Sequence, residues 1–141
     1  METKQCVVHI ISDWMVEAAN HSCGGYDPDV DEIPLSGLTT LPGTTVDVPR
    51  IKECAVAMEC TLDASHEIKN GAGKVTSTIM ICRVVITHVN KHVYNAERGV
   101  VDTALLRPIS RLGGDTYGQT TGTFDLPRPN KDGTPGKLRF G

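Results

Sequence analysis

The fold is decided by the stretch VAMECTLDASHEIKNGAGKVTSTIMICRVVITHV, which runs from Val56 to Val89. In its first part the even positions are apolar and the odd positions are mostly polar, an alternation typical of a β-strand with one face toward water. Asn70-Gly71 and Gly73 supply a tight turn. The sequence therefore predicts a long antiparallel hairpin whose return strand runs from Lys74 to Val89.

The return strand is apolar at nearly every position from Ile79 to Ile86, and Arg83 is the exception. Continuous apolar runs are typical of strands covered on both faces, so we expect this strand at the centre of a closed or covered sheet. A charge in such a strand needs a partner or an opening to water. Arg83 is therefore either paired with Glu59 or Asp63 of the neighbouring strand or aimed into a ligand cavity.

The flanking segments predict shorter elements of both kinds. Residues 5–11 are rich in β-branched residues and predict a buried strand. Ser12 or Asp13 can cap a helix that continues to Asn20, and Asp102 can cap a brief helix that Pro108 limits. We expect a long irregular stretch before Val56, with a single helical turn around residues 30–35, and two further short strands, at 92–95 and 121–126. The fold class predicted is mainly β, with antiparallel hairpins in a barrel-like or split-barrel-like arrangement and two short helices.

Composition limits the functional classes. The 141 residues fit one domain, and the net charge of −3 argues against a general nucleic-acid binder. No apolar run is long enough to span a membrane, and the N-terminus lacks the pattern of a signal peptide, so we expect a cytoplasmic protein. The five cysteines show no CxxC spacing, which favours free and mostly buried thiols over disulfides.

Local motifs for catalysis or metal binding are weak. The five histidines have no metal-ligating spacing, so no metal site is predicted, and the sequence contains no nucleophile elbow or phosphate-binding glycine loop. The acidic run DPDVDE, residues 27–32, either serves as a cation or acid–base site or forms a solvated loop with helix-cap residues.

One family resemblance covers residues 2–129. The run LRPISRLGG at 106–114, followed by Tyr117, Phe124 and LPRP at 126–129, resembles the C-terminal signature of flavin reductase-like proteins, which are FMN-binding split-β-barrel oxidoreductases. The segments ETKQCVVHIISDWMVEAANHS, DVDEIPLSGLTT, AVAMECTL and RVVITHVN resemble further segments of that family in the same order. We therefore expect a flavin reductase-like domain at 1–129, shortened at its N-terminus, and a polar tail at 130–141.

The resemblance implies an FMN-dependent oxidoreductase that takes hydride from a nicotinamide donor. Family members are homodimers with flavin near the interface, so a homodimer, or a partner chain that completes the barrel, is expected here. The resemblance also nominates site residues. Those expected to bind the cofactor are Arg111, Gly113, Gly114, Asn20 and Ser22, and those expected to be catalytic are His88, Tyr117 and His9.

Three alternatives remain open at this point. Met1 corresponds to the middle of a typical family member, and the usual N-terminal half supplies much of the FMN cradle, so weakened FMN binding is expected. A cofactor-free isomerase, cyclase or dehydratase could use the same cavity, with Asp31 and Glu32 joining the two histidines and Tyr117 as acid–base candidates. A non-catalytic partner subunit is the other possibility.

The glycine pair has an alternative role of its own. Gly113-Gly114 could serve only turn geometry, with Arg111 paired to Asp115 or Asp125.

Overall fold

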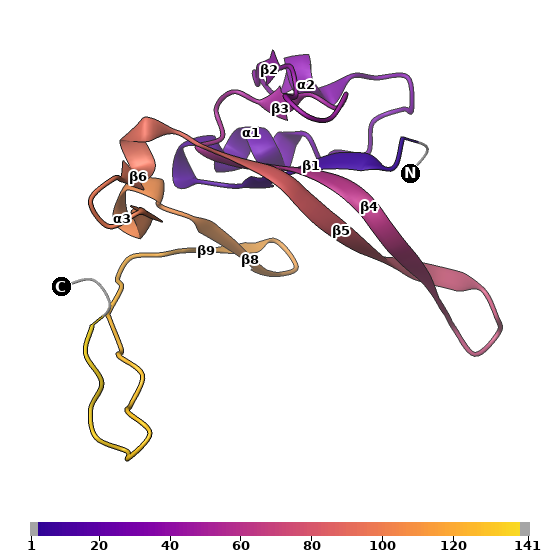
Figure 1. Cartoon of the computed structure of the whole chain (residues 1–141). Coiled ribbons are helices and arrows are strands. Elements are labelled where there is room, and N and C mark those ends of the chain that lie inside the picture. Colours follow the sequence, from indigo (N-terminus) through magenta and orange to yellow (C-terminus); the bar gives the residue numbers. More distant parts are fainter. Residues whose placement is uncertain (1–2, 139–141) are drawn as a thin grey trace.

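The main sheet has three antiparallel strands in the order β1-β4-β5. The computed structural model describes residues 3–138 of the chain. The strands are β1 (Gln5–Ile10), β4 (Val56–Lys69) and β5 (Val75–Val89). Figure 1 shows that β4 and β5 continue past β1 as a two-stranded ribbon, and residues 63–81 of this ribbon are called the arm. The predicted hairpin is confirmed, and its turn is closed by Asn70 Oδ1, which accepts the amides of Ala72 and Lys74.

The central position predicted for β5 is wrong. The strand pairs with β4 along one edge, and within residues 3–138 no strand pairs with its other edge. Ile79, Met80 and Ile81 are each more than half exposed. The apolar run makes β5 suited to burial on both faces. Within residues 3–138, however, no segment buries these three side chains. Arg83 donates to both carboxylate oxygens of Asp63, so the paired alternative is confirmed.

The wet face predicted for β4 is also wrong at its first half. Burial follows position along this strand rather than side of the sheet, since Ala57 and Glu59 are buried as fully as Val56 and Cys60. From Asp63 onward both faces are exposed. The reason is that β1 and the segment 40–51 cover only the first half of β4, whereas the second half lies in the arm.

The remaining elements are short. Either Ser12 or Asp13 was expected to cap the first helix with its side chain. The helix instead starts with a 3-10 turn, and neither side chain caps it. The predicted cap by Asp102 is confirmed, because its Oδ1 accepts the amides of Ala104 and Leu105. The helices are η1 (Asp13–Met15), α1 (Val16–His21), α2 (Glu32–Leu35), η2 (Lys91–Val93) and α3 (Thr103–Leu106), and the strands are β2 (Thr40–Leu41), β3 (Arg50–Ile51), β6 (Tyr94–Asn95), β7 (Val100–Val101), β8 (Ile109–Gly113) and β9 (Thr116–Gln119).

The mainly β class is therefore confirmed, with the two predicted short helices and a third α-helix, α2, where a single helical turn was expected. The additional helix α2 begins at the acidic run, where Asp31 Oδ1 accepts the amide of Ile33, so at least this aspartate acts as a cap. The strand predicted at 121–126 is wrong, since the last hairpin is β8–β9, and of 92–95 only Tyr94 and Asn95 are in a strand.

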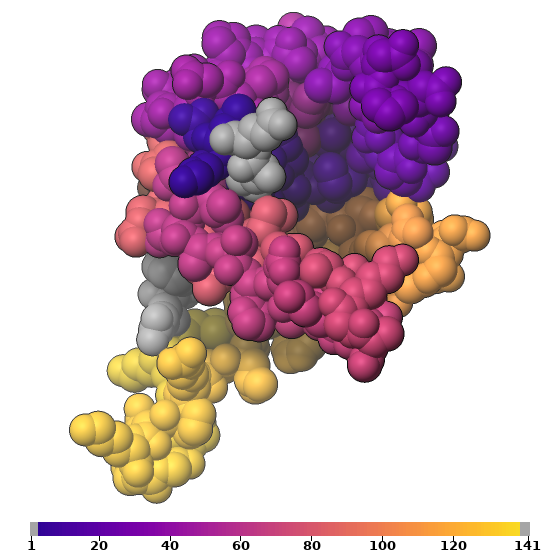
Figure 2. All heavy atoms as spheres, turned by 90° about the vertical axis from the view of Figure 1, so that its right-hand side faces the viewer, coloured from indigo at the N-terminus to yellow at the C-terminus, as the bar shows by residue number. Residues whose placement is uncertain are grey.

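A small core joins the main sheet to the C-terminal elements. Ala55, Val56, Val93 and Leu106 are buried together, and Ile10, Val89 and Val101 pack against them. Residues 120–138 contain no helix or strand and stand away from the body (Figures 1 and 2). Within residues 3–138, no helix is long and apolar enough to cross a membrane.

Candidate functional site

The fold brings together residues from opposite ends of the chain. Tyr117 of β9 donates its hydroxyl to Asn20 Oδ1 of α1 at 2.8 Å, across a sequence separation of 97 residues. Arg111 of β8 donates through Nη1 to the Tyr117 hydroxyl at 2.5 Å and through Nη2 to the carbonyl of Gly114. These residues are called the Asn20–Tyr117–Arg111 cluster. Three residues that the sequence nominated separately thus form one connected site.

The β8–β9 hairpin positions two members of this cluster. Arg111 and Tyr117 are directly paired across the hairpin, and the guanidinium carbon lies 4.7 Å from the centroid of the tyrosine ring. Gly113 and Gly114 have φ values of 135° and 51°, which L side chains rarely adopt, so the turn requires glycine at both positions. The alternative ion pair of Arg111 with Asp115 or Asp125 is not formed, because its two terminal nitrogens hold Tyr117 and Gly114 instead.

Two further groups lie at the end of α1 beside Asn20. Ser22, nominated for cofactor binding, donates its hydroxyl to the carbonyl of Ala19 at 2.9 Å. The thiol of Cys23 lies 3.0 Å from the carbonyl oxygen of Asn20 and 3.8 Å from its Oδ1, and the residue is exposed. The sequence pattern did not predict this contact of Cys23 with the cluster.

His9 and His88 lie apart from this cluster, on one face of the main sheet. Both are paired with Ala57 of the central strand, one from each side. His88 Nε2 lies 2.7 Å from Oε1 of Glu59, a carboxylate with no exposed surface. The sequence placed Glu59 on a wet face and did not nominate it for a site.

Glu59 holds the segment 44–46 through hydrogen bonds. Its carboxylate accepts the amides of Thr44, Thr45 and Val46 at 2.8, 2.7 and 3.2 Å, and the hydroxyl of Thr45 at 2.7 Å. Burial by itself raises the pKa of Glu59, but the hydrogen bonds from Thr45, Thr44 and His88 outweigh it and hold the pKa well below its usual range. Glu59 is therefore a fixed anion around which this segment turns.

His9 holds the same covering segment further along. Its Nε2 accepts the amide of Ile51 at 2.9 Å, which requires an unprotonated nitrogen, and Gln5 Oε1 accepts the amide of Asp47 at 2.9 Å. Burial and the charge of Arg50 lower the pKa of His9, in agreement with a neutral ring. Both nominated histidines thus already have polar contacts within the fold, and the Asn20–Tyr117–Arg111 cluster contains neither of them.

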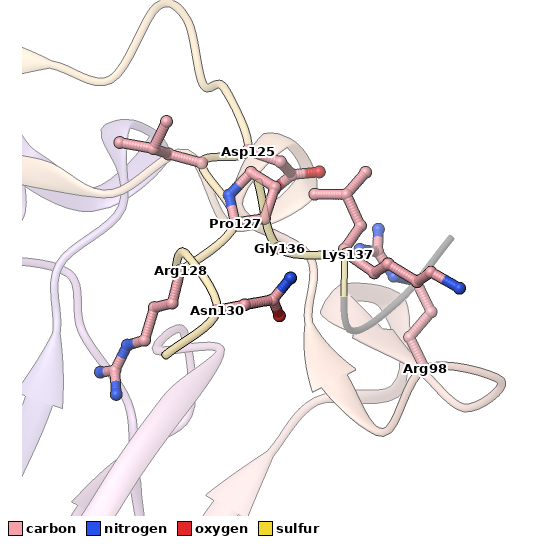
Figure 3. Close-up of a pocket in the computed structure, with 9 residues that line it drawn as sticks. Arg98, Asp125, Pro127, Arg128, Asn130, Gly136 and Lys137 are labelled. Carbon is pink, nitrogen blue, oxygen red and sulfur yellow. The ribbon is translucent and has the colours of Figure 1, made fainter. Parts of the chain in front are cut away.

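A cavity of about 450 Å³ lies at the tail, lined in part by Arg98, Asp125, Arg128 and Lys137 (Figure 3). It contains none of the residues that the sequence nominated. Figure 2 shows a different hollow, bordered by the indigo N-terminal segment, the pink arm and the orange β8–β9 hairpin. Because the Asn20–Tyr117–Arg111 cluster joins α1 to that hairpin, it is the candidate site of this chain.

Comparison with known proteins gives one consistent result. The family described as "Flavin reductase like domain" matches residues 1–105. The uncharacterized protein YwrF of Bacillus subtilis is 35% identical over 130 residues, which are 92% of this chain and 63% of that protein. This match extends beyond residue 105, so the likeness also includes part of the region that carries Arg111 and Tyr117.

Solved structures agree. Component B of nitrilotriacetate monooxygenase from Bacillus cereus superposes with a TM-score of 0.82 at 33% identity, covering 89% of this chain and 61% of that one. A split-barrel protein of Shewanella frigidimarina gives a TM-score of 0.76 at 20% identity, with coverage of 89% and 61%, and shows the fold alone. The chain spans between 61% and 63% of the length of these three relatives.

Proposed function

Because this chain belongs to the flavin reductase-like family, we propose that it binds FMN and takes part in hydride transfer from a nicotinamide donor. The observation that supports this proposal is the Asn20–Tyr117–Arg111 cluster, in which residues 97 positions apart converge on one hydroxyl. The family match and the structural relatives show that the chain is a flavin reductase-like protein. The identity of the cofactor and of the hydride donor is what we propose.

In this proposal the cluster holds one side of a planar aromatic cofactor. The Arg111 guanidinium lies over the ring of Tyr117, which is 37% exposed, so a flat and polarised surface is presented. At Gly113 and Gly114, a Cβ would meet no atom within 4 Å, and the absence of side chains lets a ligand approach the backbone closely. Arg111, Tyr117, Asn20 and the two glycines are therefore the residues that would hold the cofactor.

Each residue of the cluster has a separate role in this proposal. Arg111 brings a permanent positive charge, which stabilises negative charge on a neighbouring ligand. Tyr117 is oriented because its hydroxyl accepts from Arg111 and donates to Asn20, and Asn20 fixes that direction. A bound flavin would supply the hydride chemistry, and the chain would bind, orient and polarise it.

We also propose a homodimer or a partner chain for this protein. Within residues 3–138 the outer edge of β5 pairs with no strand, and Ile79, Met80 and Ile81 of the arm are exposed. Both features support this proposal, since an uncovered apolar edge strand favours association with another chain. Size-exclusion chromatography with light scattering measures the mass. A stable, folded monomer at micromolar concentration would contradict this part of the proposal.

The FMN proposal is tested by titrating the purified protein with FMN and recording the visible spectrum. Arg111→Gln should weaken binding about 10- to 100-fold, because hydrogen bonds to charged groups are worth about 1.5–3 kcal/mol. Tyr117→Phe should weaken binding by a smaller factor, since it removes only the hydroxyl. Arg83→Gln is the matched control, because Arg83 is paired with Asp63 in the arm and should not affect FMN binding.

Two outcomes decide the matter. If wild-type protein shows no spectral change at saturating FMN, the chain does not bind flavin by itself and the proposal fails. If Arg111→Gln binds FMN as tightly as Arg83→Gln while both have native circular dichroism, flavin binding does not use the cluster.

A further inference from the structure

Another cavity, of about 600 Å³, lies around Trp14 and is lined by Trp14, His92, Ala104, Leu105 and Arg107. Trp14 is the one tryptophan of the chain. It is 40% exposed, and Leu105 beside it is 53% exposed. None of the lining residues belongs to the Asn20–Tyr117–Arg111 cluster or contacts Glu59, so the cavity is separate from the sites described above.

The aromatic wall of this cavity is held in place. The indole Nε1 of Trp14 donates to the carbonyl of Glu53 at 3.1 Å, which fixes the plane of the ring. The ring of His92 stands 5.9 Å from it, centroid to centroid, at an angle of 59°. Because the indole is 40% exposed and its orientation is fixed, its exposed surface can contact a second flat ring without further ordering.

The cationic wall is held as well. Arg107 ends α3 in the left-handed region, with φ 47° and ψ 58°, and precedes Pro108. Its guanidinium carbon lies 5.3 Å from the centroid of the Trp14 ring, and Nη2 is 3.1 Å from Asp13 Oδ1. A backbone conformation that L residues seldom adopt thus accompanies the placement of the guanidinium against the indole.

The polar groups of the cavity suit an anion. Asp13 engages one terminal nitrogen of Arg107, while a guanidinium has five N–H donors and this side chain is 55% exposed. His92 also lines the cavity and adds the nitrogens of its imidazole ring to that wall. Asp13 is the acidic group in contact with Arg107, and its side chain is only 23% exposed.

We propose that this cavity binds a planar aromatic ring that carries an anionic group, with the ring on the face of Trp14 and the anion on Arg107. Nucleotides and aromatic carboxylates share this chemistry. The cavity is built on the same two segments as the Asn20–Tyr117–Arg111 cluster. Trp14 and Asn20 lie near opposite ends of η1–α1, and Arg107 stands four residues before Arg111.

The test uses the fluorescence of the single tryptophan. AMP added to the full chain should quench Trp14 saturably, adenosine should bind about 10-fold or more weakly because it lacks the anion, and ribose 5-phosphate should not quench. Benzoate is titrated in parallel. Saturable quenching by AMP but not benzoate assigns a nucleotide, and the reverse assigns an aromatic carboxylate. If neither AMP nor benzoate quenches Trp14, the proposal is overturned. It is also overturned if acrylamide cannot quench Trp14 in the free protein, because the cavity is then covered.

Matched variants locate the binding. Leu105→Glu places a negative charge at the mouth of the cavity and should weaken binding of the quenching ligand about 10-fold or more. Leu35→Glu is the control, because Leu35 is 54% exposed and also lies in a four-residue helix. Equal affinity of the two variants would overturn the proposal. FMN binding by Leu105→Glu should be unchanged, so the AMP and FMN results fail or succeed independently. Arg107→Gln with native circular dichroism should lose the preference for AMP over adenosine.

Discussion

The hydroxyl of Thr45 gives the sharpest test of how Glu59 holds the covering segment. It donates to Glu59 Oε2 at 2.7 Å, and the amides of Thr45 and Val46 donate to the same oxygen. Thr45→Val removes the hydroxyl and keeps the shape of the side chain and both amides. The substitution therefore removes one charge-assisted hydrogen bond from a buried carboxylate without altering the backbone contacts.

The expected cost follows from the geometry of that bond. Hydrogen bonds to charged groups contribute about 1.5–3 kcal/mol, and the lower end applies because two amides still satisfy the same oxygen. At this chain length, 1 kcal/mol corresponds to about 3 °C in the melting temperature, so Thr45→Val should melt about 4 °C below wild type. Glu59 is shielded from solvent, so water cannot readily replace the missing donor.

Thr44→Val is the matched control, because Thr44 contacts Glu59 through its backbone amide. Thermal unfolding followed by far-ultraviolet circular dichroism at neutral pH measures both variants. Thr44→Val should melt within about 1 °C of wild type, a shift equivalent to a few tenths of a kcal/mol. Equal melting temperatures for the two variants would refute the assignment of the Thr45 hydroxyl as a stabilising donor.

Three further substitutions test the other buried or capping polar groups. Because the folded pKa of His9 is below the unfolded value of about 6.5, the unfolded state binds the proton more readily and stability should fall as pH decreases below about 6.5. His9→Gln keeps an acceptor for the amide of Ile51 but cannot titrate. Its melting temperature should therefore fall less than that of wild type between about pH 7.5 and pH 5.5. An equal fall in melting temperature for both proteins would contradict this. Asp102→Ala should destabilise the protein by about 1 kcal/mol through loss of the cap on α3. Ser12→Ala should not, because its buried hydroxyl has no partner within residues 3–138; urea unfolding of both variants decides between these expectations.

Local sequence was sufficient where neighbouring residues carry the information. The hairpin from Val56 to Val89 follows from alternation and from the Asn70-Gly71 turn, and the cap at Asp102 follows from one side chain and the amides next to it. The β8–β9 hairpin was missed although Gly113-Gly114 marks its turn, because its strands contain few apolar or β-branched residues.

The candidate site was predicted only in part. Asn20, Arg111 and Tyr117 were nominated from the family resemblance, and the structure joins them in one cluster. Glu59 was assigned to a wet face because alternation reports the side of a strand and not what covers it. The long covering segment at 40–51 has little periodicity, so its position over Glu59 and His9 could not be read from the pattern.

The sequence by itself determined the antiparallel β class, the long hairpin and the family, since turn chemistry, alternation and ordered motifs are local properties of the chain. Only the tertiary structure decided that β5 lies at an edge, that Glu59 is a buried anion and that Tyr117 meets Asn20 across 97 residues. The physical reason is that burial and hydrogen-bond partners depend on which distant segments fold against a side chain, and neither propensity nor period encodes that choice.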